Sequence, residues 1–202
     1  LAGESYAGKY MPSLAERILD LKRLGKCDLN LQGIALGDAF LAPMVQRLIK
    51  GEQAYWNGLM GQTQLEQIRT IESRCIRHIQ DGNTHQIPSS CEDLKSYMLL
   101  AAGIINVYDV RKFVPSTNKT LINQYLNRED VRLALHVPDE KRHYNTNAKS
   151  DVYFNLRFDI LKSVKHLIPM LMEHVRVLLY NGNFDLQDGP VGTEQYLHSL
   201  GI

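Results

Sequence analysis

The sequence has little net charge and no long apolar run. Its 202 residues carry a formal net charge of +1, and basic and acidic residues are interspersed, so no surface typical of nucleic-acid binding is indicated. The longest apolar stretch, near 167–172, is far shorter than the roughly 20 residues of a membrane-spanning helix. We therefore expect neither a nucleic-acid nor a membrane partner. A hydrophobic content of 44% favours one globular domain, or one domain with a large insertion.

Cysteine is scarce as well, with only Cys27, Cys75 and Cys91. The three have no C-x-x-C spacing, which excludes the common metal and redox motifs, and we expect no metal and no cofactor. Two predicted helices that could form a hairpin would bring Cys75 near Cys91. A disulfide there is possible, but sequence does not determine cysteine pairing, and the state of Cys27 stays open.

The first ten residues contain the pattern of a nucleophile elbow. Ser5 is flanked two positions away by the small residues Gly3 and Ala7, which suit a sharp strand-to-helix turn where bulky neighbours would collide. Such a turn lifts the serine hydroxyl above the sheet and points helix N-terminal amides, beginning with that of Tyr6, at the same place. We predict a nucleophile beside half an oxyanion hole. The strand that should precede the elbow is missing before Leu1, which indicates a truncated sequence.

The rest of the chain predicts an α/β arrangement with a helical insertion. A helix should follow the elbow and end at Gly25, and the pattern over 29–36 predicts a buried strand, which makes half of a βαβ unit. Capping patterns predict helices beginning near Thr63, Ser90 and Asn127, and a further helix should span 163–174 with Pro169 as a kink or boundary. Residues 175–180 are predicted to form a second core strand. The predicted division is core over 1–43, helical cap or insertion over 44–169, its C-terminal part returning to the core, and core over 170–202.

Asp185 follows this last strand, where open α/β sheets place their functional groups. A serine nucleophile needs a base and an orienting acid, and in α/β-hydrolases the chain order is serine, acid, histidine. Ser5 and Asp185 satisfy the first two places, provided that a large insertion separates them. An ordinary turn residue is the alternative role for Asp185.

No histidine convincingly completes such a triad. His198 is the only one after Asp185, and it is expected on a helix surface, whereas His166 and His174 precede the acid. We therefore expect the base to lie beyond Ile202. On that basis the 202 residues alone should neither fold stably nor hydrolyse peptides.

Glu4 is an unusual neighbour for a nucleophile. At about 5 Å and an effective dielectric near 20, its charge would oppose an oxyanion by roughly 3 kcal/mol. In one interpretation Glu4 points away and is hydrogen-bonded to its surroundings. In the other it is buried and protonated, and it donates a hydrogen bond to an anionic group of the substrate such as a free peptide C-terminus. Activity should then decline as the pH rises above neutrality.

Several segments resemble the serine carboxypeptidases, in register along the whole chain, with the vitellogenic-like subgroup loosely nearest. The similar segments are Gly3-Glu4-Ser5-Tyr6-Ala7-Gly8-Lys9-Tyr10-Met11-Pro12, Gly33-Ile34-Ala35-Leu36-Gly37-Asp38, Asn106 to Arg111, Tyr125 to Val137, and Tyr180-Asn181-Gly182 with Asp185 and Gly192-Thr193-Glu194. Two departures are Ala42, where an acidic residue is usual, and the polar run Gln187-Asp188-Gly189, where many members are apolar. The second departure puts local substrate contacts in doubt.

The resemblance implies an α/β-hydrolase fold with a mainly helical cap, here incomplete, and removal of single residues from peptide C-termini at acidic pH. It implies Ser5 as nucleophile, the Tyr6 amide as oxyanion donor, Asp185 as orienting acid and Glu4 as a group that binds the substrate carboxylate. The family's Trp-Asn-Gly-Gly-Pro-Gly segment should precede the chain and its histidine should follow it. A lysosomal, vacuolar or secreted location is implied, and the sequon at Asn118 is a compatible glycosylation candidate.

Three other functions remain open. A family relative could transfer the acyl group to an alcohol instead of water. A catalytically silent paralogue could act as a binding or scaffold protein. A lipase or esterase is disfavoured, because Glu4 beside the serine suits an anionic substrate end rather than an apolar ester.

Overall fold

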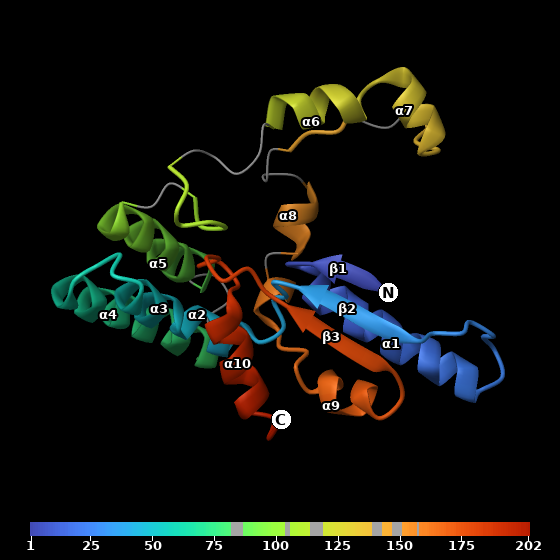
Figure 1. The fold of residues 1–202 in the computed structure, drawn as a ribbon, viewed down its shortest axis with the longest axis horizontal. Coiled ribbons are helices and arrows are strands. Elements are labelled where there is room, and N and C mark those ends of the chain that lie inside the picture. Colours follow the sequence, from blue (N-terminus) through green and yellow to red (C-terminus); the bar gives the residue numbers. More distant parts are fainter. Residues whose placement is uncertain (82–86, 104–105, 114–118, 139–142, 147–150, 157) are drawn as a thin grey trace.

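A computed structural model describes residues 1–81, 87–103, 106–113, 119–138, 143–146, 151–156 and 158–202 (Figure 1). In chain order the elements are β1 (Ala2–Glu4), α1 (Ala7–Arg23), β2 (Gly33–Gly37), α2 (Pro43–Leu48), α3 (Lys50–Trp56), α4 (Gln62–Gln80), α5 (Ile87–Ala102), α6 (Lys119–Leu126), α7 (Glu129–Ala134), α8 (Asp151–Leu156), η1 (Asp159–Leu161), α9 (Leu167–Met172), β3 (Arg176–Tyr180) and α10 (Pro190–His198). As predicted, no strand occurs in the described part of the chain between β2 and β3. The division into core and cap stays a prediction.

The three strands form one parallel sheet in the order β1-β2-β3. Glu4 pairs with Gly37 and Gly37 with Tyr180, so all three strands end at the same edge of the sheet. The predicted βαβ arrangement is confirmed. The expectation that no strand precedes the elbow within this chain is wrong, because β1 supplies three paired residues immediately before it. The strand predicted over 29–36 begins only at Gly33, where pairing with β3 begins.

Helix α1 packs on the sheet through small residues. It contacts β1, β2 and α9, and α9 also contacts β3, so these two helices lie on one face of the sheet (Figure 1). A side chain at Gly8 would place its Cβ 2.7 Å from the Phe40 backbone nitrogen, so the close approach requires glycine. On the other face Leu178 is 57% exposed. The core beneath the sheet is built from buried side chains of α1, β2, α9 and α10, including Ala15, Ile34, Leu36, Ile168, Leu171 and Tyr196.

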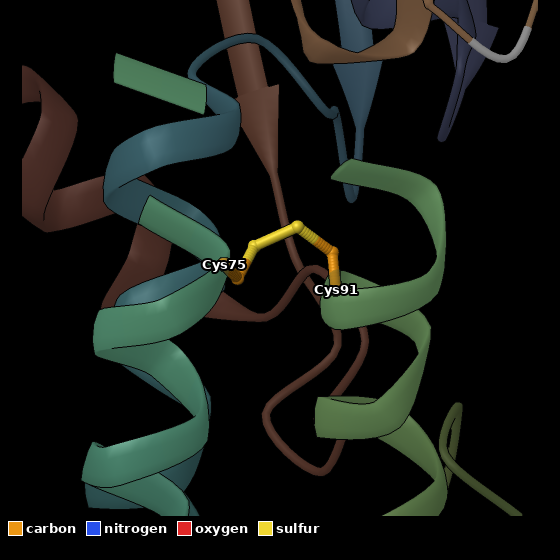
Figure 2. Close-up of a disulfide and its surroundings, with 2 residues drawn as sticks. All are labelled: Cys75 and Cys91. Carbon is orange, nitrogen blue, oxygen red and sulfur yellow. A yellow bond between two sulfur atoms is a disulfide. The ribbon is translucent and has the colours of Figure 1, made fainter. Parts of the chain in front are cut away.

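Helices α4 and α5 form a hairpin that a disulfide bridges (Figure 2). Cys75 of α4 and Cys91 of α5 are bonded, with their Cα atoms 5.0 Å apart, which confirms the possible pairing, and Cys27 is a free thiol. A second core cluster lies beside this hairpin and includes Ala54, Ile68, Leu94, Met98 and Leu186. Leu186 comes from the segment that carries Asp185, so the hairpin and the predicted acid share one core.

Several predicted helix ends are wrong in detail. Helix α4 begins at Gln62, and its capping interaction is a bond from the Gly61 amide to Gln64 Oε1 (3.1 Å), not one made by Thr63. Helix α7 begins after Arg128, because Asn127 uses its amide oxygen to accept a hydrogen bond from the distant Tyr144 backbone nitrogen. The cap of α4 is thus local but lies at Gly61 instead of Thr63, whereas at Asn127 a longer-range bond replaces the predicted cap.

Helix α9 is shorter than the predicted span over 163–174. It begins at Leu167, and Pro169 lies in its first turn, where backbone N–H groups have no partner inside the helix. Proline is therefore tolerated there and marks the beginning of the helix. None of the helices in the described ranges is long and apolar enough to cross a membrane.

Candidate active site

Ser5 occupies a strained turn between β1 and α1. Its φ angle is +56°, in the left-handed region that non-glycine residues rarely adopt, which costs on the order of 1–3 kcal/mol. The Ser5 amide donates to Gly37 O (2.9 Å), and Ser5 O accepts from the amides of Gly8 (2.9 Å) and Phe40 (3.0 Å). These bonds fix the turn from both sides while the residue itself stays exposed. The predicted strand–turn–helix geometry of an elbow is confirmed.

The small residues that identified the elbow are required by its packing. A Cβ added to Gly3 would lie 2.4 Å from Ala7 Cβ, far inside van der Waals contact. The first residue after the turn, Tyr6, has a backbone N–H that donates to no acceptor within the described ranges. An unused amide next to an exposed serine hydroxyl is what an oxyanion donor needs.

The side chain of Tyr6 is anchored far along the chain. Its hydroxyl donates to Asp159 Oδ2 (2.6 Å), in η1. The pKa of Tyr6 is raised, first by burial and then by its hydrogen bond to Asp159 and the charge of that carboxylate. Sequence reasoning missed Asp159, because nothing near it in the chain indicates a partner in the elbow.

A buried lysine lies behind the elbow. Lys9 is 4% exposed, and its Nζ has no hydrogen-bond partner among the described residues and lies 5.4 Å from the centre of the Phe40 ring. Burial lowers the pKa of Lys9 to about 8, an effect that the charge of Asp159 opposes and that of Arg47 increases. A cation in this position partly offsets the negative charge of Asp159 next to the predicted oxyanion donor.

Asp185 is buried in a tightly bonded turn after β3. It is 5% exposed, its Oδ1 accepts from the amides of Gln187 (2.5 Å) and Asp188 (2.8 Å), and its backbone oxygen accepts from Gln53 Nε2 (3.0 Å). Its other carboxylate oxygen, Oδ2, accepts nothing from the part of the chain that is described. A held carboxylate with one free oxygen can accept a hydrogen bond from an imidazole N–H, which is the task of an orienting acid.

The electrostatic surroundings of Asp185 disfavour its charge. Burial raises its pKa to about 6; the amides of Asp188 and Gln187 act against this, the charge of Asp38 adds to it, and that of Lys50 acts against it. An opposing cation is therefore part of this site.

Asp38 and Asn181 support the acid from the neighbouring strand ends. Asp38 also has a positive φ angle, +39°, and its Oδ1 accepts from Gly182 N (2.9 Å) and Asn181 Nδ2 (3.3 Å). Asn181 Nδ2 donates in addition to Asp188 O (2.9 Å). Sequence reasoning placed Asp38 at a strand end without giving it a role. The sequence did contain a signal for Asp38, because it closely follows a predicted buried strand, as Asp185 follows another.

A third segment closes the turn from outside. Leu186 N donates to Val107 O (2.8 Å) and Val110 N donates to Phe184 O (3.1 Å), so residues 107–110 run along the acid-bearing turn. The pKa of Tyr108 is raised, first by burial and then by the charges of Asp185, Asp188 and Glu4. Glu4 and Asp185 thus both lie close enough to Tyr108 for their charges to affect it.

Glu4 is exposed in this structure. Its carboxylate makes no hydrogen bond within the described residues, so the interpretation that it is bonded to its surroundings finds no support there. The alternative interpretation, a buried Glu4, also differs from this structure, in which the side chain is exposed.

The remaining predicted groups are placed as follows. No histidine within the described residues is hydrogen-bonded to Ser5 or Asp185, and His198 is exposed at the end of α10, as expected. The described part of the chain contains no group of His, Cys, Asp or Glu side chains that could hold a metal ion. The glycosylation candidate Asn118 lies outside the described residues.

Comparisons with known proteins agree with this geometry. The family model described as serine carboxypeptidase matches residues 1–202. A probable serine carboxypeptidase from Dictyostelium discoideum is 31% identical over 205 residues, which cover 99% of this chain and 40% of that protein. A human probable serine carboxypeptidase is 30% identical over 210 residues, which cover 99% of this chain and 43% of that protein. The chain therefore spans about two fifths of the length of these curated relatives.

A solved structure shows the fold. The prohormone-processing carboxypeptidase from Saccharomyces cerevisiae matches with a TM-score of 0.73 at 20% identity, over 96% of this chain and 46% of that one. The predicted fold class, an incomplete α/β-hydrolase fold, is confirmed.

Proposed function

The chain belongs to the serine carboxypeptidase family, and we propose that the protein containing it removes single residues from peptide C-termini through an acyl-enzyme formed on Ser5. The observation that carries this proposal is the elbow itself. Ser5 is exposed in a strained turn, followed by an unused amide, at the sheet edge that also carries the buried Asp185. Strain and a free donor at one exposed serine favour catalysis over a structural role.

Each of these groups has a distinct task in the proposed reaction. Ser5 Oγ attacks the carbonyl carbon of the last peptide bond and gives its proton to a histidine base, and the Tyr6 N–H donates to the oxyanion that forms. The base then protonates the leaving amino acid as the C–N bond breaks, and water hydrolyses the ester. Asp185, held at Oδ1, orients the base through Oδ2 and stabilises its charged form.

Glu4 is the proposed recognition group for the substrate's C-terminal carboxylate. Its position one residue before Ser5, at the end of β1, supports this role. A substrate that covers this exposed side chain would remove it from water. A protonated Glu4 would then donate to the substrate carboxylate. On this proposal, activity falls as the pH rises above neutrality.

We infer that the histidine lies outside residues 1–202. Support comes from the absence of any histidine bonded to Ser5 or Asp185 within the described residues. The 202 residues by themselves should then be inactive. The Cys75–Cys91 disulfide supports an oxidising compartment, and with the family membership it favours a lysosomal, vacuolar or secreted location.

The test uses the complete protein and a pair of peptides that differ only in a free or an amidated C-terminus. We expect release of the last residue from the free peptide at acidic pH, at least about 100-fold slower cleavage of the amidated one, and no activity in Ser5→Ala. Glu4→Gln should raise KM for the free peptide and leave the slow cleavage of the amidated one unchanged. Equal cleavage of both peptides, or activity in Ser5→Ala, would contradict the proposal.

Two further assays separate the open alternatives. An alcohol added as acceptor would yield an acylated alcohol in place of the acid product if the protein is an acyltransferase. An organophosphate should label Ser5 stoichiometrically. Absence of label in a folded, complete protein would indicate a catalytically silent relative.

A further inference from the structure

Lys50 and Asp188 form a buried ion pair behind the acid-bearing turn. Lys50 Nζ lies 4.0 Å from Asp188 Oδ1, and the two side chains are 11% and 5% exposed. Taking two charges out of water costs several kcal/mol per ion, which their attraction need not recover, so a buried pair is weak evidence for a stabilising role. Its position next to Asp185 suggests a different use.

Asp188 belongs to the same hydrogen-bonded turn as Asp185. The Asp188 amide donates to Asp185 Oδ1 (2.8 Å), while its backbone oxygen accepts from Asn181 (2.9 Å). The geometry of this turn is therefore set by the backbone of Asp188. Its carboxylate is not needed for those bonds and is free to face α3.

Helix α3 holds the turn at two points. Lys50 is its first residue, and Gln53, one helical turn later, donates to the backbone oxygen of Asp185 (3.0 Å). Residues three apart lie on the same face of a helix, so one face of α3 carries both groups. Gly189 leaves room for this approach, because a Cβ there would lie 2.0 Å from Asp185 O and 3.0 Å from Gln53 Nε2.

The charges around Asp185 are mostly negative. Asp38 lies at the end of β2 and Asp188 in the same turn, and the cations are Lys50 of α3 and Arg47 of α2. Glu4 of β1 acts on the neighbouring Tyr108, on which Asp185 and Asp188 also act. Of the two cations, Lys50 lowers the pKa of both aspartates and Arg47 that of Asp188. The pKa of Asp188 is raised, first by burial, and the charge of Lys50 opposes that rise.

We propose that Lys50 is a positioning residue for Asp185: through its buried pair with Asp188 it holds the acid-bearing turn against α3 and offsets the negative charge around the Asp185 carboxylate. This inference rests on the proposed function, because it assigns Asp185 the role of orienting acid. Lys50 acts through Asp188, and its charge lowers the pH at which Asp185 ionises, against the rise in pKa that burial causes. Removal of the Lys50 charge raises the pKa of Asp185 and that of its histidine partner. Both changes therefore move the acidic limb of the pH profile in the same direction, to higher pH.

The experiment compares pH profiles of kcat/KM for three variants of the complete protein. Lys50→Met should move the acidic limb up by about one pH unit, so that kcat/KM falls about tenfold at the acid end and changes less than about twofold at pH 7.5. Lys50→Arg, which keeps the charge, should restore the profile. Asp188→Asn removes a negative charge but keeps the backbone N–H, and it should move the limb down.

Opposite shifts of the acidic limb in Lys50→Met and Asp188→Asn would show that the charge of Lys50 is responsible. A purely structural role would lower activity at all pH values without moving the limb. An unmoved limb in Lys50→Met, or shifts of the same sign in Lys50→Met and Asp188→Asn, would overturn the proposal. If Lys50→Met does not fold, Asp188→Asn alone decides by the direction of its shift.

A direct titration separates this inference from the proposed function. The carboxyl 13C signal of Asp185, followed by NMR against pH, should titrate at higher pH in Lys50→Met than in the parent, whether or not peptides are cleaved. A shifted Asp185 signal in a protein that does not cleave peptides would contradict the proposed function alone. Cleavage with an unshifted signal contradicts the role of Lys50.

Discussion

The hydroxyl of Tyr6 and the carboxylate of Asp159, 153 positions apart in the sequence, are joined by a 2.6 Å hydrogen bond. The residue that supplies the proposed oxyanion donor is thereby tied to the short helix η1, which precedes α9. A bond from a hydroxyl to a carboxylate is stronger than one between neutral groups. Loss of this contact should therefore affect both the position of the elbow and its stability.

We expect Tyr6→Phe to lower the free energy of unfolding by about 1–2 kcal/mol and to reduce kcat more than it raises KM. Asp159→Ala should have a similar effect, and the double variant should lose less than the sum, with a coupling of about 1 kcal/mol. Tyr10→Phe is the matched control, since this exposed tyrosine of α1 lies next to Tyr6, the N-cap of the same helix, with ring centres 6.0 Å apart. Strict additivity would show that the bond contributes nothing.

The elbow also makes a prediction about Gly3. Because a Cβ at this position would lie 2.4 Å from Ala7 Cβ, Gly3→Ala forces β1 and α1 apart. We expect a loss of about 1–3 kcal/mol of stability and a larger loss of activity, measured by urea unfolding and peptide hydrolysis. Gly182→Ala is the control for stability, because its Cβ would lie 3.7 Å from Asp185 Cβ, an ordinary contact. Equal midpoints for the two variants would contradict the packing argument.

Short-range patterns carried most of what sequence could predict. The elbow was visible because the constraint on Gly3 and Ala7 acts within five residues, and β3 was visible because its apolar run ends sharply before the turn of Asp185. The parallel arrangement followed from strand, helix and strand in that order. Sequence left the Cys75–Cys91 disulfide open, because its formation depends on how two helices pack against each other.

Contacts between distant segments could not be predicted. Lys50 resembles any polar residue at a helix start, and only the fold shows that it is buried against Asp188, 138 positions later. Asp159 and Gln53 are similar cases, since each meets its partner in the site more than 100 positions away. The predicted cap at Asn127 was wrong for the same physical reason, because its amide oxygen accepts from the backbone nitrogen of Tyr144, 17 positions away.

The disulfide predicts a specific loss of stability. Cys75 and Cys91 close a loop of 16 residues' separation, and a cross-link of that length stabilises by about 3 kcal/mol in the chain-entropy model. We expect the double variant Cys75→Ala/Cys91→Ala to lose about that much, measured by urea unfolding of the oxidised parent and the variant. Cys27→Ala is the control, because Cys27 is free. Alkylation in denaturant should label one of the three thiols before reduction, and labelling of all three would contradict the bond.

The last prediction concerns Glu72, which lies buried on α4 one turn from Cys75. The residue is 6% exposed, and its Oε1 has no hydrogen-bond partner within the described residues. Burial raises the pKa of Glu72 to about 7; the backbone N–H of Gly51 opposes this rise, the charge of Glu52 adds to it, and that of Arg69 opposes it. The folded protein therefore holds a proton on Glu72 at pH values where the unfolded chain has released it.

The sign of the effect follows from linkage. The folded-state pKa lies above the unfolded value of 4.5, so the folded state binds more protons between these two pH values, and stability falls as the pH rises from about 4.5 to 7. A difference of this size corresponds to about 3 kcal/mol. Glu72→Gln cannot ionise, and we expect it to lose this part of the pH dependence, so that its stability relative to the parent improves from pH 5 to pH 7.

Urea unfolding of the complete protein at several pH values between 4.5 and 7.5 measures this difference. Glu66→Gln, an exposed position on the same helix, should leave the slope unchanged. Asp185 titrates in an overlapping range, but it is present in parent and variant alike, so the difference between the two curves reports Glu72 alone. Parallel curves of unfolding free energy against pH for Glu72→Gln and the parent would contradict this prediction. They would show that Glu72 has the same pKa in the folded and the unfolded state. A slope that is smaller in Glu72→Gln than in the parent would mean that Glu72 makes the folded protein more stable in the acidic range where we expect the enzyme to act.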